Sequence, residues 1–309
     1  MLITVAICTR DRMVSLARCL EALSGQTVPA EQFEILVVDN APGFDASRQR
    51  AAGFADIANL RWVHAAEPGV ARARNVAIAQ ARAPLLAFID DDVLASPGWL
   101  AALLDGFGRF GEAVHSLGGP VRPRWSAPRP HWLADPLLPY LALIDRGDRL
   151  RLLAPQEWVA GANSAYRTQA VRAVGGFNPW LGRLGDILLS NEETELAGRL
   201  RAAGGSIGWV PGAAVEHCIV VERLTQPWFR RRIAWQAVSD FLQKPEHAHG
   251  QRGVNWAEAE GFFERTRGSN ALHALAAAQS DPGRFLPEIA AIYHLVLSLL
   301  NGLESGGPG

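Results

Sequence analysis

The stretch 87–100, AFIDDDVLASPGWL, decides the fold, because it places three carboxylates directly after an apolar run. Asp90, Asp91 and Asp92 cannot all enter a core, and like charges this close repel one another. Since side chains alternate along a strand, we expect Asp90 and Asp92 to share one side and Asp91 to face another. Some other group must then hold the three acids together at the end of the strand.

Four apolar runs of this kind recur in the first third of the chain, at 2–8, 33–38, 60–64 and 85–89. The segments between them have helical period, and intervals of roughly 25 to 30 residues are typical of βαβ units. Continuous apolar runs favour strands of a parallel sheet that is covered on both faces. The sequence therefore predicts an open α/β sheet with helices on both faces.

Polar residues end three of the four runs. Thr9 to Arg12 follow the first run, Asp39 and Asn40 follow the second, and the three aspartates follow the fourth. Sheets of this class bind ligands outside the carboxyl ends of their strands. We therefore expect these side chains to line one crevice.

The composition is that of a globular chain of one large domain or two smaller ones. Of 309 residues, 49% are hydrophobic and 20% are charged, which suffices for a sizeable core. The formal net charge is −1, so no long-range positive field favours nucleic acid, and we expect no nucleic-acid partner. Three scattered cysteines lack metal-type spacing and fit a reducing compartment.

The segments near the two ends of the chain predict where in the cell the protein acts. The start has an apolar run without a basic segment before it or a cleavage site after it, so we expect a cytoplasmic protein. The segment 285–303 is apolar with helical spacing, which favours a helix packed on the protein. Attachment of this helix to the inner face of a membrane is the alternative.

The aspartate triplet has two interpretations. Carboxylates at this spacing suit a hard divalent cation, with coordination positions left for water and for substrate phosphates. Such a cation would offset the repulsion between the acids. The alternative is that one aspartate caps the helix expected near 98–110 and the others are solvated.

Other polar positions are less specific. Asp39 could accept hydrogen bonds from a base or ribose, or it could stabilise the turn that follows it. The segment 68–81 begins like a helix whose amino terminus attracts phosphate. Arg72 and Arg74 lie about 200° apart around such a helix, so they cannot both face one ligand.

A second acidic cluster lies at 190–195. Ser190 and Glu193 match a capping box, which would explain Glu193 structurally. Glu192, Glu193 and Glu195 together supply more acid than a cap requires. A carboxylate there could remove a proton from a hydroxyl, provided that desolvation restores the basicity that the helix dipole lowers.

With these segments in order, the chain resembles the family 2 inverting glycosyltransferases of the GT-A fold. The resemblance extends from Val5 to His217. The segments that carry it are VAICTRDR, EILVVDN, PGVARARN, FIDDDVLASPGWL, GANSAYR, VGGFNPWLGRLGD, NEETELAGRLRAAG and IGWVPGAAVEH. It implies a GT-A type Rossmann-like mixed sheet with a helical C-terminal region. The implied parts are a nucleotide-sugar-binding half (1–113), an acceptor-binding and catalytic half (114–220) and a helical extension (221–309).

The resemblance also implies the reaction and its residues. A sugar would pass, with inversion, from a nucleotide diphosphate sugar, usually a UDP-sugar, to a hydroxyl of a glycan or lipid-linked acceptor in polysaccharide biosynthesis. The residues implied to bind the nucleotide are Thr9, Arg12, Asp39, Arg74, Asn75, Asp90 and Asp91.

The metal, Mn²⁺ or Mg²⁺, is implied to be held by Asp92, with Asp90 nearby. His217 resembles a late metal ligand of some relatives, although a histidine that ends a strand is often structural. Glu193 aligns with the second acid of the family's Glu-Asp pair and is the implied general base, with Glu192 as the alternative. Glu193 departs from the commoner Asp, which changes the reach of the carboxylate.

The acceptor side is expected to involve Trp180 and Asn163. An indole offers a broad apolar face on which a sugar ring can stack. Trp180 precedes the second acidic cluster in a Gly-rich segment, and Asn163 lies in the matching segment GANSAYR. Packing against neighbouring residues is the alternative for the tryptophan.

Two rival functions share these features. A sugar nucleotidyltransferase also needs acids and an α/β crevice, but it is expected to carry a Gly-rich basic loop after the first strand, and CTRDRMVSL lacks glycine. A non-catalytic nucleotide-sugar-binding module would need neither a complete aspartate triplet nor both glutamates. The presence of all five acids favours the transferase.

Overall fold

The structure is a computed structural model that describes residues 1–43, 54, 57–243 and 280–305. The chain forms two compact units. The first comprises Met1–Arg124, Ala142–Gly185 and Glu192–Cys218, and the second comprises Trp125–Leu141, Asp186–Asn191 and Ile219–Gly309.

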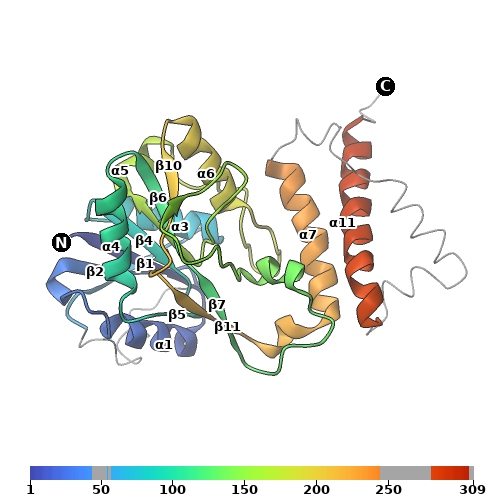
Figure 1. Cartoon of the computed structure of the whole chain (residues 1–309), viewed down its shortest axis with the longest axis horizontal. Coiled ribbons are helices and arrows are strands. Elements are labelled where there is room, and N and C mark those ends of the chain that lie inside the picture. Colours follow the sequence, from blue (N-terminus) through green and yellow to red (C-terminus); the bar gives the residue numbers. More distant parts are fainter. Residues whose placement is uncertain (44–53, 55–56, 244–279, 306–309) are drawn as a thin grey trace, which may run out of the picture. The chain divides into compact units, whose positions relative to one another are not determined.

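The first unit is built around a large mixed sheet. Its strands are β1 (Ile3–Thr9), β2 (Phe33–Asp39), β3 (Leu60–His64), β4 (Leu85–Ile89), β6 (Val114–Gly118), β8 (Arg151–Leu152), β9 (Asn163–Arg167) and β10 (Ser206–Trp209). Their spatial order is β3-β2-β1-β4-β9-β6-β10-β8 (Figure 1). The helices are α1 (Met13–Ser24), the short η1 (Ala30–Gln32), α3 (Val70–Gln80), α4 (Trp99–Phe110), α5 (Thr168–Ala173) and α6 (Glu192–Ala202).

The first four strands follow from the apolar runs of the sequence. β1 pairs in parallel with β2 and with β4, and β2 pairs in parallel with β3. All residues of β2 and β4 are buried, as expected for central parallel strands. The order therefore reverses between β1 and β4, and right-handed crossovers put α1 and α3 on opposite faces. The predicted fold class is confirmed in this half.

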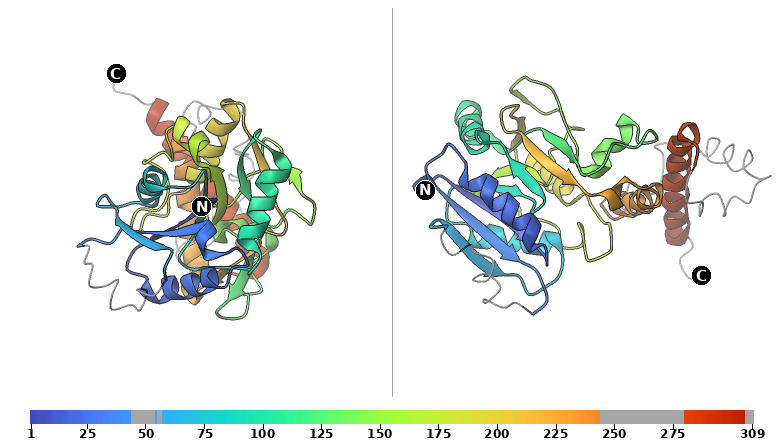
Figure 2. Two further views of the ribbon diagram at one scale, coloured as in Figure 1. Left: turned by 90° about the vertical axis from the view of Figure 1, so that its left-hand side faces the viewer. Right: turned by 90° about the horizontal axis from the view of Figure 1, so that it is seen from below.

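The second half of the sheet is mixed. β9 inserts between β4 and β6 and runs antiparallel to both. β10 then pairs in parallel with β6. Figure 2 gives two further views of the ribbon. α4 packs on β6 and α6 packs on β10. In α4, Trp99, Leu103 and Phe107 are buried at helical spacing, so this amphipathic helix fills the core on its face of the sheet.

The first unit also contains a second, three-stranded sheet, whose strand order is β5-β11-β7. Its strands are β5 (Val93–Ala95), β7 (Val121–Trp125) and β11 (Val215–Ile219). β6 of the large sheet ends at Gly118, and β7 of the smaller sheet begins at Val121. Pro120 lacks a donor, and a Cβ on Gly119 would lie 2.1 Å from the carbonyl oxygen of Ala213, so the chain changes sheets here.

The second unit is mainly helical, as the sequence predicts for the C-terminal region. It contains η3 (Asp135–Leu141), η4 (Val221–Leu224), α7 (Gln226–Gln243) and α11 (Pro282–Ser305). Trp132 packs edge-on against Phe229 of α7 and Phe285 of α11, with ring centroids 5.3 and 4.8 Å apart. Arg230 of α7 forms a buried ion pair with Glu288 of α11. These contacts hold the two helices together.

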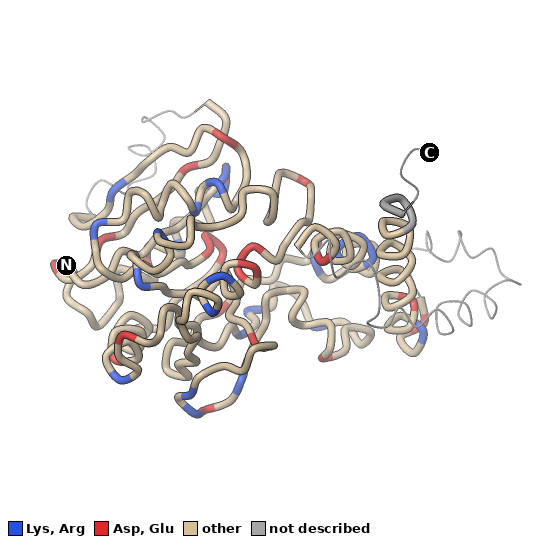
Figure 3. The backbone as a smooth tube through the Cα atoms, turned by 90° about the horizontal axis from the view of Figure 1, so that it is seen from above, with Lys and Arg blue, Asp and Glu red and all other residues tan. Residues whose placement is uncertain are grey.

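α11 is also the described helix that meets the length and composition of a membrane span. The window Pro282–Asn301 has a mean hydropathy of 1.3, and 28% of it is buried within the protein. Core helices of other proteins satisfy the same criteria. Figure 3 shows basic and acidic positions interspersed along the chain, in keeping with a net charge of −1.

Candidate functional site

The carboxyl ends of β1 and β4 are neighbours at the point where the strand order reverses. Thr9 Oγ1, at the end of β1, donates a hydrogen bond to Asp91 Oδ2 over 2.7 Å. Arg12, between β1 and α1, donates to Asp91 Oδ1 over 2.7 Å and to Asp92 Oδ2 over 2.8 Å. Thr9, Arg12, Asp91 and Asp92 therefore lie together at these strand ends. Such switch points are where open α/β sheets bind ligands.

The three aspartates divide differently from the sequence expectation. β4 ends at Ile89, and the chain turns, with the Val93 N–H donating to the carbonyl of Asp90 over 3.1 Å. Because strand alternation does not continue through a turn, Asp91 and Asp92 both reach Arg12. Asp90 instead meets Arg74 over 3.2 Å. The expected grouping of Asp90 with Asp92 on one side is therefore wrong.

Burial alters the acidity of Asp91. Burial raises the pKa of Asp91 to about 7, against the lowering effects of Arg12 and of the Thr9 hydroxyl. Asp91 and Asp92 are 3% and 5% exposed. The Arg12 side chain is 38% exposed, so it forms the solvent-facing side of this cluster.

His217 is brought to this cluster by the smaller sheet. β11 pairs antiparallel with β5, with His217 opposite Val93, and the Cys218 N–H donates to the carbonyl of Asp92 over 2.9 Å. His217 Nε2 consequently lies 3.5 Å from Asp92 Oδ1. Both side chains are buried. The sequence shows no periodic signal for this pairing, which joins positions far apart in the chain.

Two side chains of this cluster could hold a divalent cation. Asp92 and His217 supply one carboxylate and one imidazole, whereas Asp90, expected nearby, is paired with Arg74. The described part of the chain holds no group of three His, Cys, Asp or Glu residues arranged for a metal. Mg²⁺ is commonly held by one or two protein ligands plus substrate phosphates and water. The pair fits such an ion when a diphosphate completes the coordination.

Asp39 is the last residue of β2 and lies in register with Thr9. Its Oδ1 accepts a hydrogen bond from the Ala41 N–H over 2.9 Å, so one carboxylate oxygen stabilises the following turn. Asp39 is 6% exposed. Its contact with a nucleobase stays a prediction.

Asn40 has a role that the sequence pattern did not reveal. Its Nδ2 donates to the carbonyls of Ala65 and Glu67, each over 2.7 Å, and its Oδ1 accepts from the Gly69 N–H over 2.9 Å. These bonds fix the segment that leads from β3 into α3. Its place directly after a strand-ending aspartate was the only signal in the sequence.

The helix α3 directs its two arginines to different surroundings, as its period predicts. Arg72 is partly exposed, with Nε 3.2 Å from Glu67 Oε2. Arg74 is 3% exposed and donates to Glu192 Oε1 over 2.8 Å and to Asp90 Oδ1 over 3.2 Å. Its observed contacts are thus with acids of the chain itself, and its contact with a nucleotide stays a prediction.

Asn75 is likewise engaged by the protein. Its Nδ2 donates to the carbonyl of Phe177 over 2.8 Å, and its Oδ1 accepts from the Phe177 N–H over 2.7 Å. Both ends of the amide therefore hold the loop that follows α5. The contact of Asn75 with a nucleotide stays a prediction.

The second acidic cluster opens α6. Glu192, Glu193 and Glu195 lie in its first turn. The predicted capping box does not form, because Ser190 Oγ bonds to Gln236 Oε1 over 3.1 Å and to Asn191 Oδ1 over 3.4 Å. Glu193 is therefore not explained by capping.

Glu192 and Glu193 differ in their partners. Glu192 is 6% exposed and is paired with Arg74. The Glu193 carboxylate accepts backbone hydrogen bonds from its own N–H and from Gly161, while its Oε2 is buried with no hydrogen-bond partner among the described residues. Burial and the neighbouring Glu192 charge raise the pKa of Glu193 to about 7, against the lowering effect of Arg74. A carboxylate of this pKa is suited to accept a proton near neutral pH.

The Gly-rich loop before α6 presents Trp180, whose residue is 75% exposed. The guanidinium of Arg72 lies 5.8 Å from the centre of its ring. The loop is tied to α3 by the Val70 N–H, which donates to the carbonyl of Arg183 over 3.0 Å. It also passes close to the acids, since a Cβ on Gly182 would lie 3.2 Å from Glu192 Oε2. An exposed indole thus stands on the loop that borders the acid pair.

Asn163 is in the core, so its predicted contact with an acceptor is wrong. It is 0% exposed. Its Oδ1 accepts from Trp99 Nε1 over 2.8 Å, and its Nδ2 donates to the carbonyls of Ala213 and Pro120 over 2.8 and 3.2 Å. The side chain satisfies backbone groups where the two sheets meet.

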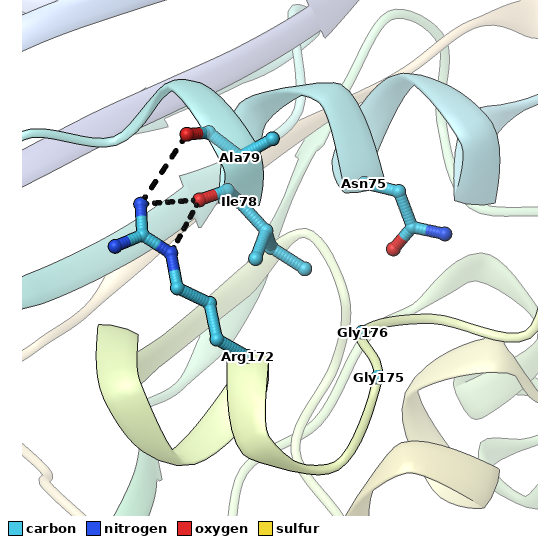
Figure 4. A pocket seen from close by; sticks show the side chains of 6 residues that line it. All are labelled: Asn75, Ile78, Ala79, Arg172, Gly175 and Gly176. Atoms are coloured by element: carbon cyan, nitrogen blue, oxygen red, sulfur yellow. Dashed lines mark hydrogen bonds between the residues drawn. The ribbon is translucent and has the colours of Figure 1, made fainter.

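A separate hollow of about 390 Å³ lies beside α3 (Figure 4). Its lining residues are Asn75, Ile78, Ala79, Arg172, Gly175 and Gly176. Arg172 donates to the carbonyls of Ile78 and Ala81 over 2.7 and 2.8 Å and so caps the carboxyl end of α3. The cation there is explained by capping, and the lining contains no carboxylate, so we place the candidate site at the acid clusters instead.

The order of these features along the chain agrees with a known family. The sequence model of the family described as "Glycosyl transferase family 2" matches residues 4–172 of this chain. The chain belongs to glycosyl transferase family 2. As a member of this family it is a glycosyltransferase, and the resemblance stated from the sequence is confirmed.

Two curated relatives illustrate the family. The chain is similar to the glucosyl-dolichyl phosphate glucuronosyltransferase of Haloferax volcanii, with 25% identity over 77% of this chain and 76% of that protein. It is also similar to the succinoglycan biosynthesis protein ExoM of Rhizobium meliloti, with 27% identity over 81% of this chain and 77% of that protein.

Solved structures support the fold. The mannosyltransferase PcManGT from Pyrobaculum calidifontis, in complex with GDP-Man and Mn²⁺, matches with a TM-score of 0.61 and 17% identity over 98% of this chain and 87% of that one. S. aureus TarS 1-349 in complex with UDP-GlcNAc matches with a TM-score of 0.53 and 14% identity over 98% and 92%. At these identities the likeness concerns the fold alone, and the predicted GT-A architecture is confirmed.

Proposed function

We propose that this glycosyltransferase uses a divalent cation, transfers the sugar of a nucleotide diphosphate sugar with inversion, and places it on a hydroxyl of a glycan or lipid-linked glycan. The observation that carries the proposal is the cluster of Asp91, Asp92, Arg12 and His217 at the switch point of the sheet. Two buried acids, a histidine and a solvent-facing arginine are suited to hold a metal and a diphosphate together.

The donor side would work by neutralising charge. Asp92 and His217 would hold Mn²⁺ or Mg²⁺, and the ion would neutralise negative charge that develops on the departing diphosphate. Arg12 can contact phosphate oxygens when it leaves the aspartates, because its side chain is 38% exposed. Asp39 lies in register with Thr9, and Thr9 is bonded to Asp91, so these are the groups that we assign to the nucleoside.

The acceptor side would supply the base. The Glu193 carboxylate takes the proton of the acceptor hydroxyl as the oxygen forms its bond to the anomeric carbon. On the opposite face, the bond from that carbon to the diphosphate breaks, and the diphosphate leaves with the electron pair. Attack opposite the leaving group gives inversion.

Glu193 suits this role better than Glu192. Glu192 is held by Arg74 over 2.8 Å, so one of its oxygens is already engaged by a guanidinium. Each acid keeps one buried oxygen without a hydrogen-bond partner among the described residues, and the pKa of Glu193, about 7, favours proton transfer at neutral pH. The exposed ring of Trp180 is the group that we assign to the acceptor sugar, because stacking on an indole needs an open face.

The identity of the donor and acceptor rests on relatives. One solved neighbour is described with GDP-Man and another with UDP-GlcNAc, which supports a nucleotide diphosphate sugar. A relative is named a glucosyl-dolichyl phosphate glucuronosyltransferase, which supports a lipid-linked acceptor. We place UDP-sugars first among the donors. Action at the inner face of a membrane would suit such an acceptor, and the apolar α11 supports peripheral contact there.

The test is a panel of UDP- and GDP-sugars with and without Mn²⁺, read by release of the nucleoside diphosphate and by transfer to glycan acceptors. We expect metal-dependent release with one donor class and none with Asp92→Asn. The matched control is Asp105→Asn on the surface of α4, where the side chain is 64% exposed. Binding without release would favour a non-catalytic module, and release of pyrophosphate from a sugar phosphate and nucleoside triphosphate would favour a nucleotidyltransferase.

Peripheral membrane contact is tested separately. We expect the full chain to sediment with vesicles of mixed neutral and anionic lipids, and Leu299→Glu, at a position 59% exposed on α11, to reduce the bound fraction. Equal binding by both proteins would exclude α11 as the contact.

A further inference from the structure

Arg74 of α3 stands between the two acidic groups of the site. One end of its guanidinium donates to Glu192 Oε1 over 2.8 Å, and the other donates to Asp90 Oδ1 over 3.2 Å. The side chain is 4% exposed, as is typical of a buried cation that is paired with acids. Arg74 therefore links the aspartate cluster after β4 to the acid pair that opens α6.

The residues packed around Arg74 hold its guanidinium in one position. Its guanidinium lies 5.4 Å from the centre of the Phe177 ring and 5.9 Å from that of Phe88. On another side stands Gly161, where a Cβ would lie 2.8 Å from one guanidinium nitrogen. Two aromatic rings and a glycine gap thus fit the guanidinium, so its charge stays in place beside Glu192.

Gly161 also contacts Glu193, whose carboxylate accepts its backbone N–H. The same residue therefore makes room for Arg74 and holds the neighbouring acid. Glu192 receives a charged partner and Glu193 receives only backbone N–H groups, although the two residues are adjacent in sequence.

We propose that Arg74 is a positioning residue that separates the roles of the two acids: by pairing with Glu192 it leaves Glu193 as the proton acceptor. This inference rests on the proposed function, in which a carboxylate of α6 deprotonates the acceptor hydroxyl. Arg74 acts through its charge, which it places in direct contact with Glu192 and at longer range beside Glu193.

The charged and titratable groups that face Glu193 come from three elements. Glu192 lies beside it on α6, Arg74 approaches from α3, and Tyr166 lies on β9. Burial raises the pKa of Tyr166 to about 12, so the phenol stays neutral while Glu193 titrates. Within the described structure, the ionisation of Glu193 is therefore governed by Glu192, which hinders it, and by Arg74, which favours it.

The test reads Glu193 directly and needs no donor. Protein labelled with ¹³C at the glutamate carboxyl carbon is titrated by NMR, and the Glu193 signal is assigned by its loss in Glu193→Gln. In Glu192→Gln the like charge is removed and Arg74 is no longer shared, so we expect the midpoint to fall by about one pH unit or more. In Arg74→Gln the favourable charge is removed, so we expect the midpoint to rise by a similar amount.

Further variants separate charge from structure. Arg74→Lys keeps the charge and should leave the midpoint close to that of the wild type, even if it lowers the melting temperature. The double variant Arg74→Gln, Glu192→Gln should fall between the two single variants. Arg82→Gln, which removes an exposed arginine just after α3, is the control and should leave the midpoint unchanged.

The outcomes are distinct. An unchanged midpoint in Glu192→Gln, or equal midpoints in Arg74→Gln and Arg74→Lys, would overturn the inference and reduce Arg74 to a packing residue. Should Arg74→Gln fail to fold, Glu192→Gln still decides. If the midpoints move as expected but no nucleotide sugar is turned over, the proposed reaction fails while the electrostatic role of Arg74 stands.

Discussion

Replacing Glu193 by glutamine should make the protein more stable at alkaline pH while it abolishes most of its activity. Burial and the adjacent Glu192 raise the pKa of Glu193 from 4.5 to about 7. A carboxyl whose pKa is raised by folding contributes no penalty below pH 4.5, where it is protonated in both states. As the pH rises through 7, the unfolded chain has already ionised this carboxyl, whereas the folded protein must ionise it in its buried place. The free energy of unfolding therefore falls.

The magnitude follows from the pKa difference. About 2.5 pH units at about 1.36 kcal/mol each gives an upper limit of about 3 kcal/mol. Partial solvent access and the coupling to Glu192 reduce this, so we expect a gain of roughly 1–3 kcal/mol at pH 8. For a chain of this size that is about 2–6 °C in melting temperature. Loss of the base should lower the transfer rate by about 10²–10⁴-fold.

The assay is thermal unfolding of Glu193→Gln and wild type from pH 5 to pH 8. The difference should be small at pH 5 and grow with pH. The control is Glu195→Gln on the same helix turn, where Glu195 accepts from Arg199 over 2.7 and 2.6 Å, so removal of its charge should destabilise slightly at every pH. Parallel curves for Glu193→Gln and wild type, or a loss of stability at pH 8, would refute the reasoning.

Three further predictions concern the metal, the acceptor and the second unit. A nucleoside diphosphate with Mn²⁺ at about 100 times its Kd should stabilise the wild type by about 2.7 kcal/mol, and Asp92→Asn should abolish the melting shift; a retained shift would exclude Asp92 as a ligand. Trp180→Ala should raise the acceptor KM about tenfold, leave donor hydrolysis unchanged and keep the melting temperature, because the residue is 75% exposed; an unchanged KM would place the acceptor elsewhere. Tyr293→Phe removes the hydrogen bond that its hydroxyl donates to Asp240 Oδ2 over 2.6 Å and should lower the free energy of unfolding by about 1–2 kcal/mol, measured by urea denaturation; no loss would mean that water replaces the bond.

The sequence by itself determined the elements and the family. Strands β1 to β4 match the four apolar runs, and α4 matches the helix predicted near 98–110 to within a residue. Hydrophobic periodicity is a local property, so it can be read without knowing the fold. The same patterns placed Thr9, Arg12 and the aspartates at strand ends, and strand ends of a parallel sheet meet at one edge.

Only the tertiary structure decided which side chain partners which. Arg74 meets Glu192 across 118 positions, and Arg12 meets Asp92 across 80. Asn163, which looked like a surface group, serves the core, and the three aspartates divide between two arginines because the chain turns after β4. Such contacts depend on the packing of distant elements, which no local pattern encodes. The distinction between Glu192 and Glu193, adjacent and alike in sequence, exists only once α3 brings Arg74 to one of them.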